Sequence, residues 1–110
     1  MIEKIILDYL NKNLDVVAYT DKPKDEPKRY VMIEKTGGSS ENHIHSATIA
    51  IQSYAESRFE AATLNEQVKA VMDNIIILNS IGKSKLNTDY NFTDTTKKKY
   101  RYQAIYDVTY

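Results

Sequence analysis

The chain has 110 residues and a mass of 12.7 kDa, the usual size of one domain. Hydrophobic residues make up 42% and charged residues 27%, which excludes a disordered protein, and the absence of cysteine excludes disulfides, thiolate metal sites and cysteine nucleophiles. Fifteen basic and fifteen acidic side chains give no net charge and balance in both halves of the chain, which disfavours binding to nucleic acid mainly through phosphates. We expect a single domain over residues 1–110.

The first element expected is an amphipathic helix over residues 2–14. Its apolar residues recur at helical spacing, and charged residues interrupt them, so no run approaches the roughly 18 to 20 residues that span a bilayer. We therefore expect no signal peptide and no membrane contact. The apolar positions are Ile2, Ile5, Ile6, Tyr9, Leu10 and Leu14.

Three strands are expected next, arranged as an antiparallel meander. The first is the short β-prone run Val16–Thr20, which a charged loop, Asp21–Arg29, separates from a strand over Tyr30–Lys35. The loop carries both prolines of the chain, which disfavour helix in the residues before them. A turn over Thr36–Asn42 then leads to a long strand over Ile44–Tyr54.

A second helix is expected to begin at Ser57, because Ser57 and Glu60 have the spacing of a capping box. Apolar residues continue at helical spacing, and Asn79, Ser80 and Gly82 end the helix. The apolar positions are Leu64, Val68, Val71, Met72, Ile75 and Leu78.

Two strands close the chain, joined by a polar turn over Thr93–Lys98. In the first, Leu86, Thr88, Tyr90 and Phe92 alternate with polar residues; in the second, Tyr100, Tyr102, Ala104, Tyr106, Val108 and Tyr110 share one face. The predicted fold is therefore α+β, in the order α-β-β-β-α-β-β, with a mostly antiparallel sheet and two helices packed on one of its faces.

No residue pattern points to catalysis or to a cofactor. His43 and His45 would share one face of a strand, but no carboxylate or thiol completes a metal site. Ser39 or Ser40 beside Glu41 and His43 has the composition of a catalytic triad without its arrangement. Polar loop or strand positions explain these residues better. We expect no enzyme activity, no metal and no cofactor.

Contacts with partners are a more natural role for the loops and for the tyrosine-rich last strand. Tyrosine suits a surface that is part core and part interface, although most of these rings are expected to lie beneath the helices. Lys97–Lys99 form a basic cluster that could contact DNA or an acidic partner, or simply form a solvated turn. The candidate interface residues are Lys22, Lys24, Asp25, Glu26, Lys28, Arg29, Ser39, Ser40, Glu41, His43, Lys97, Lys98 and Tyr110.

Four segments of the chain resemble a known family, the tail terminator (tail completion, minor tail) proteins of bacteriophages and prophages with long non-contractile tails. They are the amino-terminal helix MIEKIILDYLNKNL, the loop DKPKDEPKRYVMIEKTGG, the junction IQSYAESRFEAATLNEQV and the tyrosine-rich carboxyl-terminal hairpin. The resemblance covers nearly the whole chain and includes no catalytic signature.

This resemblance implies a structural virion assembly protein. Such subunits form a ring, expected to be a hexamer, at the head-proximal end of the tail tube, and can be monomeric before assembly. The ring stops tube polymerisation and provides the head-tail joining surface. The implied partners are further copies, the major tail tube protein and neck or connector proteins, with DNA passing only through the lumen. The implied location is the neck region of the virion tail, and the host cytoplasm during assembly.

Two alternatives stay open. A head-completion or neck adaptor protein would share these features but bind the portal or connector. A small metal-dependent or hydrolytic enzyme would need His43 and His45 for its chemistry.

Overall fold

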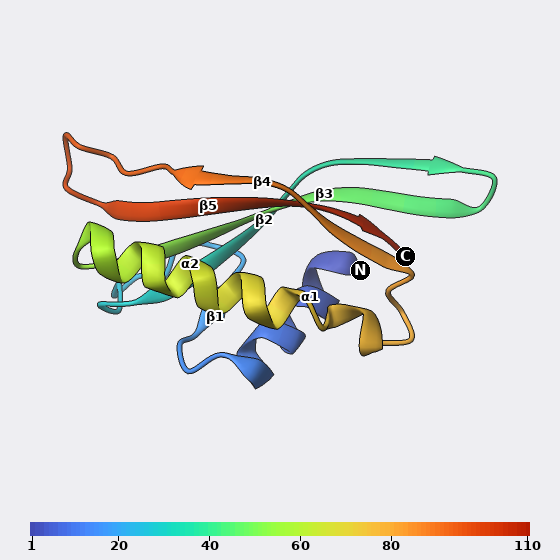
Figure 1. Ribbon diagram of the computed structural model, residues 1–110, viewed down its shortest axis with the longest axis horizontal. Coiled ribbons are helices and arrows are strands. Elements are labelled where there is room, and N and C mark those ends of the chain that lie inside the picture. Colours follow the sequence, from blue (N-terminus) through green and yellow to red (C-terminus); the bar gives the residue numbers. More distant parts are fainter.

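A computed structural model describes all residues, 1–110, and shows the expected α+β order. Two helices lie on one face of a five-stranded sheet, and the other face is uncovered (Figure 1). None of the helices is long and apolar enough to span a bilayer. The elements are α1 (Ile2–Asn13), β1 (Ala18–Tyr19), β2 (Tyr30–Glu41), β3 (Ile44–Ala55), α2 (Arg58–Met72), the 3₁₀ helix η1 (Ile75–Ile77), β4 (Lys83–Asn91) and β5 (Tyr100–Thr109).

The strands lie in the order β1-β2-β3-β5-β4, and all neighbours are antiparallel except β1 and β2. The expected antiparallel meander of the first three strands is therefore wrong at its first step. Parallel neighbours need a connection that returns the chain to the same end of the sheet. The proline-containing segment over residues 20–29 provides it, and only Ala18 and Tyr19 pair with β2.

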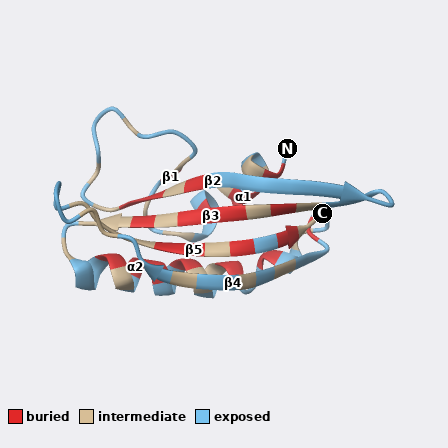
Figure 2. Cartoon of the chain, turned by 90° about the horizontal axis from the view of Figure 1, so that it is seen from above, coloured by how far each residue is buried: buried red, intermediate tan, exposed pale blue.

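The expected turn over Thr36–Asn42 is also wrong, because most of it is strand. β2 continues to Glu41, past an irregularity between Lys35 and Gly37, and a two-residue turn of Asn42 and His43 leads directly into β3. Both turn residues have positive φ, 51° and 66°, which matches the twist of the flanking strands. Residues 34–45 are all exposed (Figure 2). We call residues 36–45 the arm, because this hairpin extends beyond the helices (Figure 1).

The core lies between the sheet and the two helices. The expected alternation in β5 is confirmed, since Ala104, Tyr106 and Val108 are almost fully buried on the helix side. Eighteen buried residues form the core cluster, and the side chains from α1 and α2 in it are Ile2, Ile6, Tyr9, Leu10, Leu64, Val68 and Met72.

The second helix begins where the sequence predicts and ends earlier than expected. The Ser57 hydroxyl accepts a hydrogen bond from the Glu60 backbone N–H at 3.1 Å, which caps α2. The α-helix stops at Met72 and η1 follows, so the predicted end near Leu78 is wrong. Three consecutive isoleucines are poor helix formers because their branched side chains crowd the preceding turn. The tighter turn buries Ile75 and leaves the other two exposed.

A bulge interrupts the alternation expected in β4. The pairing with β5 shifts between Leu86 and Thr88, so Asn87 is an extra residue. An extra residue reverses the faces of all that follow it. Leu86 pairs with the buried Tyr106, whereas Tyr90 pairs with Gln103 on the uncovered face. The residues predicted to share one face, Leu86, Thr88, Tyr90 and Phe92, are therefore divided between the two faces of the sheet.

Candidate interaction surfaces

Two of the predicted contact loops meet at one end of the molecule. The Lys99 ammonium lies 2.8 Å from a Glu26 carboxylate oxygen. This ion pair joins the turn between β4 and β5 to the loop over residues 21–29. Lys22 binds the same oxygen at 3.0 Å. These two lysines, Lys99 most strongly, hold the pKa of Glu26 below its usual range. The sequence suggested both loops but gave no signal that they are neighbours.

The turn between β4 and β5 is ordered by its own acidic residue. The Asp94 carboxylate accepts hydrogen bonds from the Thr96 hydroxyl at 2.7 Å and from the backbone N–H groups of Thr96 and Lys97. The Thr96 hydroxyl is the main reason why the pKa of Asp94 is lowered. Lys98 has a φ of 52°, and Asp94 and Lys99 pair across the turn. Lys97 and Lys98 are therefore presented to solvent on a defined backbone.

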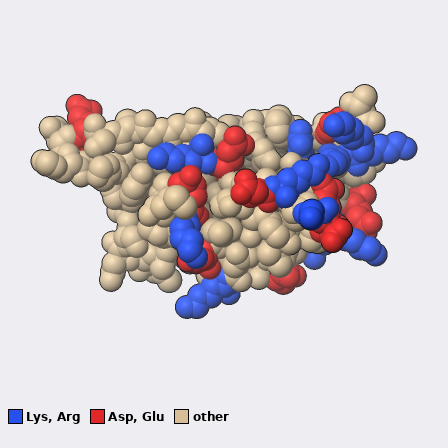
Figure 3. All heavy atoms as spheres, turned by 180° about the vertical axis from the view of Figure 1, so that it is seen from behind, with Lys and Arg blue, Asp and Glu red and all other residues tan.

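This end of the molecule carries an excess of positive charge. Residues 21–29 and 93–101, which we call the basic end, hold eight Lys or Arg and four Asp or Glu. The rest of the chain holds seven and eleven. Lys and Arg side chains gather there in Figure 3. The charge that balances along the sequence is thus separated in space, because folding brings two distant basic segments together.

A set of aromatic and polar side chains lies on the uncovered face beside the basic end. The Arg101 guanidinium lies over the Phe92 ring, 4.3 Å from its centroid, and donates to the Tyr54 hydroxyl at 3.1 Å. The Tyr54 ring stacks on Tyr30 at a centroid distance of 4.6 Å. Burial is the main cause that raises the pKa of Tyr30 to about 12. None of these four residues was among the predicted interface residues.

Hydrogen bonds continue this set across three strands. The Tyr54 hydroxyl donates to Gln52, whose amide nitrogen donates to Gln103 at 2.7 Å. Gln103 in turn donates to the Tyr90 hydroxyl. Such a connected row fixes its side chains before any partner arrives. The sequence alone does not predict this row, because the residues that face each other depend on the order and register of the strands.

The arm lies at the other end of the longest axis, along which the molecule extends 44 Å. Ser39, Ser40, Glu41 and His43 all lie on it, so this group of predicted contact residues is kept together. Tyr110 lies near its base. Its N–H donates to the His45 carbonyl at 2.8 Å and its ring stacks on the His45 ring, so it is half-buried and less free than its terminal position suggested.

The side chains considered for chemistry do not come together. His43 occupies the turn, not a strand, so it does not share a strand face with His45 as the spacing suggested. No hydrogen bond joins His43 to Ser39, Ser40 or Glu41. No group of three or more His, Cys, Asp and Glu side chains lies close enough to hold a metal ion.

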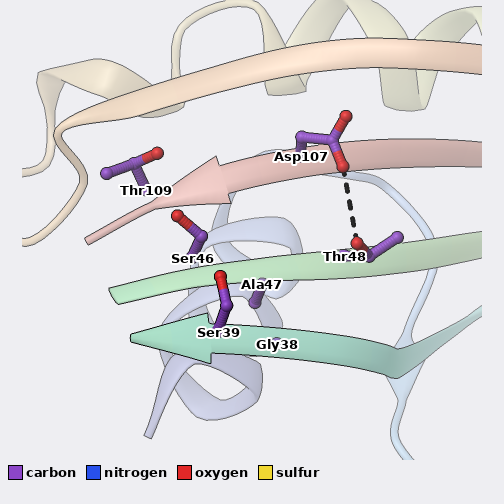
Figure 4. Close-up of a pocket in the computed structure, with 7 residues that line it drawn as sticks. All are labelled: Gly38, Ser39, Ser46, Ala47, Thr48, Asp107 and Thr109. Atoms are coloured by element: carbon purple, nitrogen blue, oxygen red, sulfur yellow. Dashed lines mark hydrogen bonds between the residues drawn. The ribbon is translucent and has the colours of Figure 1, made fainter. Parts of the chain in front are cut away.

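A shallow hollow on the uncovered face contains a single ionisable side chain, Asp107 (Figure 4). The Asp107 carboxylate accepts hydrogen bonds from the Thr48 hydroxyl at 3.4 Å and from the Asn87 amide at 3.0 Å. The other residues that line the hollow are Gly38, Ser39, Ser46, Ala47 and Thr109. The hollow therefore offers hydroxyl groups and one carboxylate, which suits a polar contact.

No protein-family model matches the chain, and no curated protein is significantly similar to it in sequence.

Proposed function

We propose that the protein is a structural subunit of a phage or prophage tail, of the terminator type that its sequence resembles. It would form a ring on the head-proximal end of the tail tube, stop tube growth and present a surface for head-tail joining. Such a task needs complementary surfaces and no reaction centre.

The arm is the observation that carries this proposal. Residues 34–45 are exposed without interruption, yet they form a regular hairpin with its own two-residue turn. The tip of this hairpin, residues 39–45, buries no side chain, and a hairpin without a buried face gains little stability in water. The arm therefore fits an element that is completed by a neighbour in an assembly.

The basic end supports a second, distinct contact surface. Lys97 and Lys98 are exposed and make no ion pair, while Lys22 and Lys99 are held by Glu26. Because the arm and the basic end lie at opposite ends of the long axis, one subunit can contact different partners at each. A ring that stops a polymer requires this difference between its faces.

Sedimentation and electron microscopy of the protein mixed with purified tail tubes test the proposal. We expect rings seated on one end of each tube and no further tube growth. Protein that neither binds nor caps tubes would refute the terminator function, and selective binding to portal or connector rings would assign it to the neck adaptors instead.

A charge variant at the basic end sharpens this test. Lys98→Glu should leave thermal melting unchanged, since Lys98 is exposed and unpaired, and should weaken tube or neck binding. Lys12→Glu makes the same charge change on α1, away from the basic end, and should not affect binding. Equal behaviour of the two variants would exclude a contact role for the turn.

A further inference from the structure

The sheet has two free edges. β1 pairs only with Val31 and Met32, so β2 has no outer neighbour from Glu34 to Glu41. β4 is the last strand on the opposite side and has no outer neighbour along its length. Each edge presents unpaired backbone N–H and C=O groups, which readily pair with another strand.

The two edges have the directions needed to pair with each other between copies. β2 is antiparallel to β3, β3 to β5, and β5 to β4, so β2 and β4 run in opposite directions. When a second copy is placed beside the first with its sheet continuing in the same sense, β4 of one copy meets β2 of the next as an antiparallel neighbour. This contact is head-to-tail, the type that can close into a ring.

Irregularities in the two strands fix the register. β2 has its extra residue between Lys35 and Gly37, and β4 has its extra residue between Leu86 and Thr88. An unmatched bulge would break a ladder, because residues beyond it would face the wrong side. When Glu41 of one copy lies opposite Lys83 of the next, Thr36 and Gly37 lie opposite Thr88 and Asn87. Each strand then has one extra residue in the same short stretch, and the faces of the two strands match on both sides of it.

The same register matches the charges. It sets Glu41 against Lys83 on the uncovered face, and Lys35 against Asp89 on the helix side. The face of each follows from its partners, since Lys35 pairs with the buried Ile49 and Asp89 with the buried Ala104. Two opposite-charge pairs form and no like charges meet, which favours this register over its neighbours.

Backbone groups are also aligned. The Val31 N–H donates to the Val17 carbonyl, so it points away from β3 toward the outer edge. Lys35 lies four positions further along and before the bulge, so its backbone N–H and C=O also point toward the outer edge. At the end of β4, the Phe92 N–H donates to the Arg101 carbonyl, so it points toward β5. Asp89 lies three positions away, so its backbone N–H and C=O point away from β5, toward the outer edge. The groups of Lys35 and Asp89 therefore face one another.

An unpaired hydroxyl supports the same contact. The Ser84 side-chain oxygen is buried and has no hydrogen-bond partner within the chain. In the register set by the bulges, the residue opposite Ser84 is Ser40 of the next copy, on the same side of the sheet. Cross-strand serine pairs can hydrogen-bond to each other.

We propose that residues Glu34–Glu41 of β2 pair antiparallel with Lys83–Tyr90 of β4 from a second copy, with Glu41 opposite Lys83. The contact runs along about 27 Å of sheet edge at the strand rise of ~3.4 Å per residue. Bulges and charges also discourage indiscriminate edge pairing, so their match makes the contact specific to this chain. The inference rests on the proposed ring and names the surfaces that build it.

Disulfide trapping tests the register directly, because the chain has no cysteine of its own. Ser40→Cys and Ser84→Cys are made as separate variants and mixed under mild oxidation, with and without tail tubes. Directly opposite residues lie about 5.5 Å apart between Cα atoms, within the range of a disulfide. We expect covalent dimers in the mixture, and few in either variant alone.

A register control uses Ser39→Cys mixed with Ser84→Cys. Ser39 is one residue away and points to the other face, so we expect few dimers. Equal trapping of Ser39 and Ser40 would overturn the register. Efficient dimers of Ser40→Cys alone would show β2 paired with β2, and no trapping in any mixture would also overturn the inference. Thermal melting of each variant confirms that it is folded.

Charge exchange supplies a second readout. Glu41→Lys and Lys83→Glu should each weaken self-association several-fold, and the variant with both changes should recover it. Rings on tubes without trapping or recovery would refute this contact and leave the proposed function standing. Trapping and recovery without any binding to tubes would support the contact and refute the terminator function.

Discussion

Two buried tyrosines should respond in opposite directions to the loss of one oxygen atom. Tyr106 in β5 is 2% exposed, and its hydroxyl has no hydrogen-bond partner within the chain. Tyr9 in α1 is 8% exposed, and its hydroxyl donates to the Val71 carbonyl in α2 at 2.7 Å. Tyr106→Phe therefore removes an unpaired polar group, while Tyr9→Phe breaks a bond that holds the two helices together.

The expected changes follow from the cost of burying a hydroxyl. In the unfolded chain water binds both hydroxyls, and a buried polar group without a partner costs about 1–3 kcal/mol. The small void left in Tyr106→Phe offsets part of the gain. We expect Tyr106→Phe to raise the free energy of unfolding by about 1 kcal/mol. A typical hydrogen bond contributes a similar amount, so Tyr9→Phe should lower it by about 1 kcal/mol.

Urea unfolding measures both variants, with the midpoint shifting and the slope unchanged. Alkaline titration adds a second check, because burial raises the pKa of the Tyr106 phenol above its unfolded value. Below about pH 10 the Tyr106 phenol is neutral in both states. As the pH rises further, the phenol ionises in the unfolded chain but not in the fold, so the free energy of unfolding falls. Tyr106→Phe should lose less stability above that pH. An equal loss of stability in both variants would refute the reasoning.

Three further changes test the core, a polar cluster and the arm. Val68→Asp places an unpaired charge on the fully buried face of α2 and should cost several kcal/mol, so an unchanged melting temperature would show that this face is not buried. Asp89→Ala removes the partner of the buried Asn65 amide and of Lys69, so urea unfolding should show a free energy of unfolding lower by about 1–3 kcal/mol. The control Glu66→Ala removes an exposed partner of Lys69 and should lower it by less than about 1 kcal/mol. The pKa of Asp89 is lowered, mainly by Lys69, so its contribution is complete above about pH 4 and is lost as the pH falls through the lower folded value. His43→Gly relieves a side chain at φ 66° and should slow amide exchange in the arm without changing global stability; faster exchange would contradict this.

Periodicity was enough to predict most of the architecture. Alternation in β5 and the cap at Ser57 depend on neighbours in the sequence, and both are confirmed. The parallel pairing of β1 and the end of α2 at Met72 depend on where the chain must go next, which no local pattern encodes. The arm was misjudged because glycines and serines usually mark a turn, whereas here hydrogen bonds to β3 hold them in a strand.

The candidate surfaces were predictable only in part. Lys97 and Lys98 are visible as a cluster in the sequence, but their proximity to the loop over 21–29 depends on the ion pair between Lys99 and Glu26. That contact spans most of the chain. The hydrogen-bonded row that includes Gln52 and Gln103 likewise joins residues whose alignment depends on strand order.

The arm also affects how the protein can change over evolution. Residues 36–45 are all exposed, so hydrophobic packing against the helices does not set how far the hairpin extends. Residues could be added or lost in matched pairs, one on each strand, without reversing the faces behind them. The reach of the subunit can therefore be adjusted in steps of about 3.4 Å while the core stays as it is.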